Sequence, residues 1–412
     1  MRYVINDQVV LSRPLEGPLK AYIGLFANWG RQQGYAVYSL HRQVLIAACF
    51  SRWLGRKGVP LRGVSSECAA RYLRYRARRV LPQRGDAAAL RHLIEFLRGE
   101  GVIPTPQAPP PKLIPVERYT QAFERYLREE RALATATIIS YAPFIRSFLK
   151  DRFGKGEVML SRLCARDVVR FVQRQAPRLH LKRAKLLTTA LRSFLRYARY
   201  RGEVTVDLAA AVPVVANWSM TSLPRAISAD QVRQLLASIN RRTEIGRRDY
   251  AILLLLARLG LRSGEVAFLE LDDIDWNIGQ LSVRGKGGQR TELPLSAEVG
   301  RAIAAYLRRG RPASASRRVF LRAKAPIRGF RDASGVGSIV RHSLKRAGIN
   351  APTQGAHQFR HGLATEMLRQ GASLSEIGDV LGHRHPQTTL IYTKVDLSAL
   401  RTLALPWPGG AG

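Results

Sequence analysis

The sequence predicts a mainly α-helical protein of several domains, one of which also carries a small antiparallel β-sheet. Its 412 residues are enough for two to four domains. Apolar residues recur at the 3.6-residue period of amphipathic helices over most of the chain, and they alternate as in strands around one glycine-rich turn. Two proline-bearing linkers, 101–115 and 211–228, divide the chain. We therefore expect three domains and a tail, at 1–105, 112–212, 225–404 and 405–412.

The charge of the chain is far from neutral. The formal net charge is +37, and Lys and Arg outnumber Asp and Glu in each of the three predicted domains. Such a charge repels itself unless a polyanion neutralises it, whereas the alternative is a well-solvated basic surface. An excess in every domain, and not in one basic tail, favours a nucleic acid that several domains contact together.

Cysteine usage and hydropathy indicate where the protein works. Cys49, Cys68 and Cys164 have no paired spacing, which predicts small buried thiols in a reducing compartment and neither disulfides nor a zinc site. The first residues are too polar for a signal peptide. The apolar run AILLLLARLGL is too short to span a bilayer and contains Arg258. We expect a cytoplasmic, nucleoid-associated protein with no membrane partner.

The first two predicted domains share the order of their helices. Each opens with an amphipathic helix, continues with a helix that ends in an aromatic–leucine pair, and adds two more helices. The matching pairs are LKAYIGLFANWGRQQG with YTQAFERYLREER, Trp53–Leu54 with Phe148–Leu149, ECAARYLRYR with RDVVRFVQRQ, and LRHLIEFLRGEG with LRSFLRYARYRG. Amphipathic helices resemble one another whenever they share a period. The common order of four elements nevertheless favours a tandem duplication of a unit of four or five helices.

The third predicted domain is punctuated by strong local signals. Ser228 is placed to cap the helix SADQVRQLLASIN, and Gly260 to end the buried helix RDYAILLLLARLG in the left-handed region. Ser263 is expected to cap the helix GEVAFLEL. The segment QLSVRGKGGQRTELPL alternates on both sides of a glycine turn, which predicts a β-hairpin. Three more helices follow: AHQFRHGLATEMLRQG, ending at Gly371, LSEIGDVLG, and PQTTLIYTKV.

Two basic residues stand at exposed turns of this domain. Arg262 lies between the end of one predicted helix and the start of the next, where orphan backbone N–H groups already favour an anion, although an arginine there usually only solvates the turn. Lys286 lies at the tip of the hairpin. It either keeps the turn soluble or, between flanking glycines, serves as a mobile ammonium that reaches a phosphate.

The stretch HQFRH places His357 and Arg360 on one helical face, with His361 one turn from His357. Two histidines at this spacing could bind a metal, and a histidine of the later GHRHP stretch could be a third ligand. A zinc-protease helix, however, would carry a glutamate at the position of Gln358, and the guanidinium of Arg360 disfavours a cation. An oxyanion site is therefore the better interpretation.

The stretch LGHRHPQTTLIYTKV adds His383 and Tyr392. A tyrosine in a helix is usually half-buried and hydrogen-bonded through its hydroxyl. Two arginines, a lysine, two histidines and a tyrosine together form an inventory for phosphoryl transfer without a metal. Arginines bind non-bridging oxygens, a histidine moves the phenol proton, a lysine protonates the leaving alkoxide, and the phenolate attacks phosphorus in line.

The order Arg, Lys, H-x-x-R, His, Tyr resembles the tyrosine recombinase (phage integrase) family. The similar segments are LGLRSGEV, RGKGGQRTELPL, HQFRHGLATEMLRQGASLSEIGDVLGH and TTLIYTKV, which span roughly residues 228–400. The second domain is similar to the family's core-binding, SAM-like DNA-binding domain. The resemblance thus implies helical N-terminal DNA-binding domains and a mixed, mostly helical catalytic domain. The first domain departs from two-domain members and is either a further core-binding-like unit or an arm-type DNA-binding domain.

The resemblance also implies roles for single residues. Tyr392 would be the nucleophile that forms a 3′-phosphotyrosyl link and frees a 5′-hydroxyl. Arg262 and Arg360 would clamp the phosphate, and Lys286 would protonate the leaving oxygen. His357 would assist proton transfer to and from the tyrosine, whereas His383 would hydrogen-bond a phosphate oxygen and Glu265 would support the first arginine. No metal and no nucleotide cofactor would be needed.

The alternatives are a type IB topoisomerase, which relaxes supercoils without pairing two sites, and a sequence-specific DNA-binding protein without chemistry. We expect double-stranded DNA as the partner and a homotetramer on two DNA sites, alone or with related recombinases. The apolar C-terminal segment LRTLALPWPGGAG could dock on a neighbouring subunit, or fold onto its own domain. The extra N-terminal domain favours a mobile-element integrase over chromosome-dimer resolution.

Overall fold

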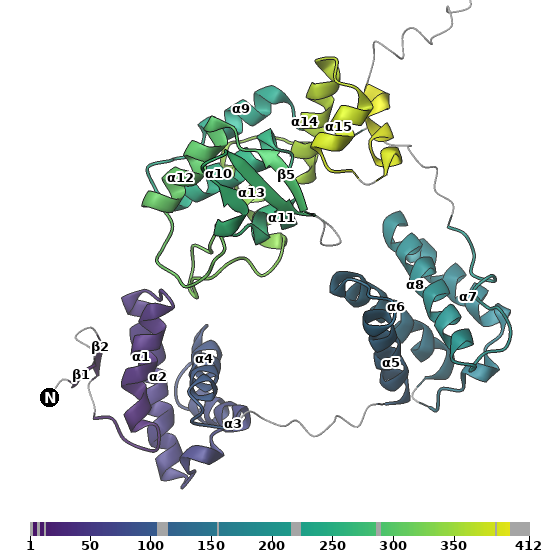
Figure 1. Cartoon of the computed structure of the whole chain (residues 1–412). Coiled ribbons are helices and arrows are strands. Elements are labelled where there is room, and N and C mark those ends of the chain that lie inside the picture. Colours follow the sequence, from purple (N-terminus) through teal and green to yellow (C-terminus); the bar gives the residue numbers. More distant parts are fainter. Residues whose placement is uncertain are drawn as a thin grey trace, which may run out of the picture. The chain divides into compact units, whose positions relative to one another are not determined.

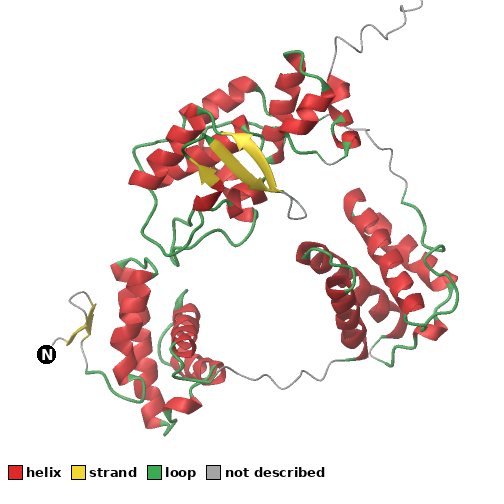
Figure 2. Ribbon diagram, viewed as in Figure 1, coloured by secondary structure: helices red, strands yellow, loops and turns green. Residues whose placement is uncertain are grey.

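The computed structural model is mainly helical, with one small antiparallel sheet in its C-terminal part (Figures 1 and 2), which confirms the predicted fold class. By compactness the chain forms two units, Gln107–Thr221 and the remainder, and the described residues of these units hold four clusters of buried apolar side chains. The structure describes residues 3–5, 9–11, 14–104, 114–154, 156–215, 224–285, 290–383 and 385–395. The tail at 405–412, residues 105–113 of the first predicted linker and residues 216–223 of the second lie outside these residues.

The N-terminal helices enclose the first of these cores, in which Phe26, Phe50 and Trp53 are buried. A short antiparallel pair, β1 (Tyr3–Ile5) and β2 (Val9–Leu11), precedes them. The helices are α1 (Lys20–Gln32), α2 (Val37–Arg56), α3 (Ser66–Ala77) and α4 (Asp86–Gly99), with the 3-10 turn η1 (Leu61–Gly63) before α3.

The middle unit has the same order of elements around its own core. Its elements are α5 (Pro115–Glu129), α6 (Thr135–Phe153), η2 (Leu160–Arg162), α7 (Ala165–Gln175), η3 (Ala176–Arg178) and α8 (Leu181–Tyr200). In both bundles the second helix packs against the other three, and the third packs against the fourth. The aromatic–leucine pairs Trp53–Leu54 and Phe148–Leu149 are buried in both. A tandem duplication would produce this correspondence.

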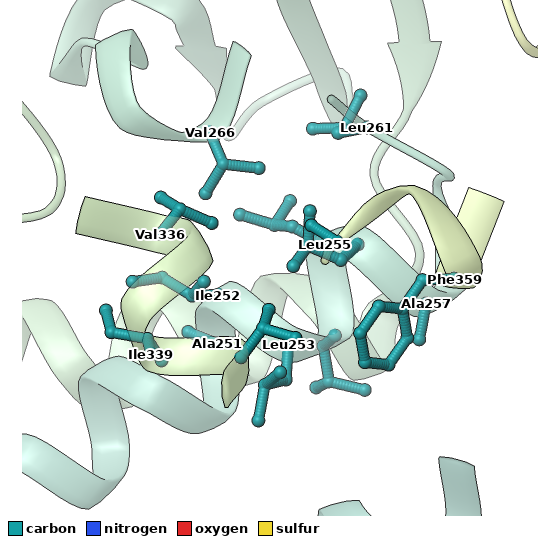
Figure 3. Close-up of a cluster of buried hydrophobic side chains, with 14 of the residues drawn as sticks. Ala251, Ile252, Leu253, Leu255, Ala257, Leu261, Val266, Val336, Ile339 and Phe359 are labelled. Carbon is teal, nitrogen blue, oxygen red and sulfur yellow. The ribbon is translucent and has the colours of Figure 1, made fainter. Parts of the chain in front are cut away.

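The C-terminal part is built around one apolar helix. The elements are α9 (Ala229–Ala237), α10 (Glu244–Arg258), α11 (Ser263–Phe268), η4 (Leu271–Asp273), β3 (Ile274–Asp275), β4 (Gln280–Arg284), β5 (Arg290–Pro294), α12 (Ala297–Arg309), α13 (Ser334–Arg346), α14 (His357–Arg369), α15 (Leu374–Val380), η5 (Pro386–Thr388) and η6 (Leu390–Val395). Residues 251–256 of α10 are fully buried and pack against Val266, Val336 and Phe359 (Figure 3). Because α10 is held on several sides, the turn that follows it is fixed in place.

The hairpin forms with the predicted alternation. Gln280–Arg284 pairs with Arg290–Pro294, with Leu281 opposite Leu293, and β3 adds a third strand at the β4 edge. Leu281 and Val283 are buried while Arg290 is exposed. The β4–β5 connection, including Lys286, lies outside the described residues, so that nothing places the lysine side chain.

The predicted ends and starts of helices agree with the structure better than the predicted types of helix do. Gly260 and Gly371 have positive φ angles of 58° and 91°, and Ser228 caps α9 through a hydrogen bond from the Gln231 backbone N–H, as expected. The prediction for Ser263 is wrong, because Arg262 holds the N-cap position and Glu265 accepts its backbone N–H.

Two further predictions need correction. The segment PQTTLIYTKV forms two 3-10 turns, η5 and η6, and not one continuous α-helix. Its β-branched residues favour α-helix weakly, and the Thr389 hydroxyl bonds the His383 ring outside the segment. Of the three free cysteines, Cys68 is buried but Cys164 is exposed, because it stands at the start of α7. No described helix combines the length and the apolar character that crossing a bilayer requires.

Candidate active site

One cavity of the C-terminal part gathers side chains that lie far apart in the sequence. Its volume is about 260 Å³, and its walls come from the end of α10, α11, the β4–β5 hairpin, α14 and the loop after α15. Arg262, Arg360 and His383 all line it. Gly285, the last described residue after β4, also lines it. Two guanidinium groups in one cavity form a natural site for an anion.

Arg262 is held in place by the carboxylate of Glu265. One oxygen of Glu265 accepts the Arg262 backbone N–H and the other accepts from Nη1, both at 2.7 Å. The glutamate side chain is only 8% exposed, whereas the arginine is 34% exposed. The i, i+3 spacing at a helix start makes this double contact possible. Anchored in this way, Arg262 lines the cavity.

Arg360 is buried between the ends of two helices. Its Nη1 donates to the carbonyl of Gly260 at 2.8 Å, and its Nη2 donates to the carbonyl of Leu381. These carbonyls follow α10 and α15, where helices leave acceptors unpaired. Burial, with a smaller contribution from the nearby charge of Arg262, lowers the pKa of Arg360 to about 10. The group remains protonated at neutral pH, and an anion in the cavity would relieve the repulsion between the two arginines.

His383 is neutral at pH 7, and its Nδ1 is hydrogen-bonded to a threonine hydroxyl. Burial, followed by the charges of Arg360 and Arg262, lowers the pKa of His383 to about 4. Its Nδ1 lies 2.8 Å from the Thr389 hydroxyl, which is itself buried. When Nδ1 accepts this O–H, the ring proton stands on Nε2 and is available to an anion.

Tyr392 is only 1% exposed and lies beside this cavity. Its hydroxyl is 3.0 Å from Nδ1 of His361, and its ring is nearly parallel to that of His383, with centroids 6.5 Å apart. Burial raises the pKa of Tyr392, while the charges of Arg360 and Arg262 act in the opposite direction. The phenol is therefore protonated at neutral pH, within the field of both arginines.

His357 stands at the exposed start of α14, one turn before His361, and the two ring centroids are 6.4 Å apart. The metal alternative required these two rings and a third ligand. Nδ1 of His361 is instead in hydrogen-bond contact with the tyrosine. Within the ranges that the structure describes, no group of three or more His, Cys, Asp or Glu residues could hold a metal ion.

Two residues of this site, His361 and Thr389, were not expected from the sequence in these roles. His361 was considered only as a possible metal ligand, although its spacing from His357 already placed it on the same helix face. Thr389 carried no signal at all, because a threonine six residues after a histidine is unremarkable until the chain turns back. The assembled groups can bind a phosphodiester, hold it between two cations, and present a phenol to it.

Comparisons with known proteins show which proteins the chain is similar to. Residues 225–398 match the model of the phage integrase family. The chain is 61% identical over 411 residues to a Sinorhizobium fredii protein named as integrase/recombinase y4rA, with 100% of both chains covered. It is 32% identical over 308 residues to the tyrosine recombinase XerD of Mycobacterium tuberculosis, which covers 70% of this chain and 96% of the other.

Solved structures share the fold at lower identity. The XerH recombinase bound to a palindromic difH substrate, in a post-cleavage complex, has a TM-score of 0.56 at 20% identity, over 69% of this chain and 83% of that chain. A λ integrase tetramer bound to a Holliday junction has a TM-score of 0.51 at 16% identity, over 76% and 88% of the two chains. At these identities the likeness concerns the fold alone.

Proposed function

The chain belongs to the phage integrase family of tyrosine site-specific recombinases, and from this premise we propose that it cuts and rejoins DNA through a covalent 3′-phosphotyrosyl intermediate on Tyr392. The phenolate oxygen attacks phosphorus, the bond from phosphorus to the 5′ oxygen breaks, and a 5′-hydroxyl is released. Attack by a 5′-hydroxyl of the exchanged strand reverses these steps. The phosphotyrosine link keeps the energy of the broken phosphodiester bond. Neither a nucleotide cofactor nor a metal is therefore required in this proposal.

The proposed roles follow from the contacts around the cavity. Arg262 and Arg360 bind the non-bridging oxygens and neutralise charge that develops in the transition state. His383 donates its Nε2 proton to a phosphate oxygen. Lys286, on a hairpin that starts at the cavity wall, protonates the leaving 5′ oxygen. His357 assists the proton movement of the tyrosine from the exposed start of α14.

The observation that carries the proposal is that Tyr392 lies in the field of both arginines of its own chain. A tyrosine that served only the core would need no cationic cavity beside it. The same observation favours cleavage in cis, with the nucleophile and the phosphate clamp from one subunit. Mixing Tyr392→Phe with Arg262→Ala protein tests this, because neither subunit can cleave in cis, whereas cleavage in trans would restore adduct.

A suicide substrate tests the enzymatic step. DNA with a nick close to the scissile phosphate loses its short 5′-hydroxyl fragment and traps the covalent adduct. We expect wild-type protein to form an adduct that Tyr392→Phe abolishes while DNA binding persists. Binding without any adduct in wild-type protein would leave a basic DNA-binding scaffold as the correct account.

Strand exchange between two sites separates a recombinase from a topoisomerase. We propose that four protomers assemble on two duplexes, since the similar λ integrase is a tetramer in its complex with a Holliday junction.

The tail beyond residue 403, which lies outside the described residues, is proposed to dock on a neighbour. Deleting it should abolish synapsis and spare cleavage of single sites. Unchanged synapsis would exclude this role.

The two helical bundles are proposed as DNA-binding domains of common origin. Arg71 of α3 and Arg170 of α7 occupy corresponding exposed positions, each directly before a buried aromatic residue, Tyr72 or Phe171. Replacing Arg71 and Arg74 with Glu should weaken DNA binding, whereas Lys at both positions should preserve it because it keeps the charge. Equal binding by both variants would argue against the N-terminal bundle as a DNA contact.

The biological setting is proposed to be a mobile genetic element. The support is the extra N-terminal bundle and the full-length similarity to a protein named as an integrase/recombinase. Amplification of a circular junction from cells that express the protein tests the proposal, and the junction should disappear with Tyr392→Phe. Resolution of chromosome dimers without any excised circle would contradict it.

A further inference from the structure

We propose that His361 receives the proton of the Tyr392 hydroxyl during cleavage and holds the phenol in place before DNA binds. The proposal rests on the proposed function of Tyr392 as nucleophile. It assigns the contact with the reacting oxygen to His361, so that His357, whose ring centroid is 6.4 Å from that of His361, assists the proton movement only through His361.

The geometry joins two segments that the sequence keeps apart. His361 lies on α14, directly after the phosphate-binding Arg360, and Tyr392 lies on η6, which packs against α14. The distance from Nδ1 to the hydroxyl oxygen is 3.0 Å, and the two rings meet edge to face with centroids 5.7 Å apart. The hydrogen bond and the ring contact together fix both the position and the direction of the phenol.

His383 is the other histidine whose ring contacts Tyr392, and it has a different hydrogen-bond partner. His383 lies parallel to the phenol, but its Nδ1 takes the Thr389 hydroxyl. When Nδ1 accepts this hydroxyl, Nε2 carries the ring proton and cannot accept another. The ring nitrogen within hydrogen-bond distance of the tyrosine hydroxyl belongs to His361.

The charge state of the pair suits proton transfer. Burial, then His357 and Arg360, lowers the pKa of His361 below its ordinary value, so the ring is neutral at neutral pH, and its Nδ1 is the nitrogen placed beside the phenol. The charged and titratable groups that face the pair are His357 and Arg360 on α14, Arg262 with Glu265 on α11, and His383 after α15. A bound phosphodiester adds a negative charge among these cations, which raises the basicity of His361 when DNA is present.

The step balances as one proton transfer and one substitution. The hydroxyl proton moves to Nδ1, the phenolate oxygen bonds to phosphorus, and the 5′ oxygen leaves with a proton from the proposed general acid, Lys286. In religation the incoming 5′-hydroxyl gives its proton to the neutral amine of Lys286, its oxygen bonds to phosphorus as the phosphotyrosyl bond breaks, and the imidazolium of His361 returns a proton to the tyrosine oxygen.

The test compares two replacements of His361 by single-turnover adduct formation. Phe keeps a ring but accepts no proton, whereas the Asn carbonyl oxygen can occupy the place of Nδ1 without being a base. We expect His361→Phe to slow adduct formation by about 10²–10⁴-fold. His361→Asn should recover part of that rate. We expect the wild-type rate to fall at acidic pH, where His361 is protonated, and the Asn variant to lack this fall. The matched control is His342→Asn, at an exposed histidine of α13 bonded to the Ser338 carbonyl, which should change neither.

A second substrate isolates the nucleophile. A 5′-bridging phosphorothiolate leaves as a thiolate and needs no general acid. It should rescue Lys286→Ala but not His361→Phe. Rescue of His361→Phe, or an Asn variant with the wild-type rate and pH profile, would overturn proton acceptance by His361. Adduct formed by Tyr392→Phe would instead refute the proposed function. DNA affinity and melting temperature, measured on the same samples, show that each variant is folded.

Discussion

Replacing Arg360 with methionine should abolish DNA cleavage with only a modest loss of stability. The lowering of the Arg360 pKa to about 10 corresponds, at about 1.4 kcal/mol per pKa unit, to a cost of about 3 kcal/mol for keeping the guanidinium charged in the folded protein. At neutral pH the arginine is protonated in both folded and unfolded chains, so the whole cost is present. Its two hydrogen bonds to carbonyls, each worth about 1.5–3 kcal/mol, act in the opposite direction.

The two contributions leave a net loss of about 0–3 kcal/mol for Arg360→Met, since methionine fills a similar volume without a charge. Arg248 provides the contrast. It is also buried, but its Nη2 and Nε donate to Asp249 at 2.7 and 3.0 Å, and its Nη1 donates to the Leu321 carbonyl. Arg248→Met leaves Asp249 as an uncompensated buried carboxylate, which should cost about 3–5 kcal/mol.

The assay is thermal unfolding of the full-length protein, alongside adduct formation on the suicide substrate. Arg360→Met should melt closer to wild type than Arg248→Met does, and it should form no detectable adduct. Inorganic phosphate or sulfate should raise the melting temperature of wild-type protein more than that of Arg360→Met, because the anion loses half of its clamp. If Arg360→Met is the more destabilised variant, the arginine is chiefly structural and our account of a charge held for phosphate fails.

Three further outcomes are expected. DNA affinity should fall by about 10³-fold or more between 50 and 200 mM salt, because many phosphates are neutralised, and a shallow dependence in filter binding or anisotropy would contradict the broad basic interface. The free energy of unfolding should fall as the pH drops from 6.5 toward 4, because His383 binds a proton in the unfolded chain but stays neutral in the folded one. Denaturant titrations of His383→Gln should show a weaker decline. Glu265→Gln should slow adduct formation by about 10–100-fold with DNA affinity kept, because the amide still accepts the backbone N–H of Arg262 but no longer anchors its charge; a wild-type rate would remove Glu265 from the site.

Local signals in the sequence were sufficient for element boundaries. Glycines at 260 and 371 end helices because only glycine adopts the left-handed region without cost, and the Ser228 hydroxyl is within reach of the first free N–H groups of α9. The same local logic failed at 386–395, where proline and β-branched residues compete with an α-helix and a contact outside the segment decides the outcome.

The chemical inventory of the site was also readable from the sequence, but its connections were not. Arg262 and Arg360 could be named from their contexts, whereas their common cavity arises because α10 is buried on several sides and presents its C-terminal turn to α14. The contact between His361 and Tyr392 joins residues 31 positions apart. No periodicity encodes such a pair, because it depends on how η6 returns across α14.

By itself the sequence determined the helical class, the hairpin, the basic charge and the residue types needed for phosphoryl transfer, since each follows from side-chain chemistry or short-range backbone preference. Tertiary structure alone decided which histidine bonds the phenol, which side chain bonds the His383 ring, and that Arg360 keeps its charge in a buried place. Those properties depend on burial and on neighbours distant in the chain, and both exist only once the helices have packed.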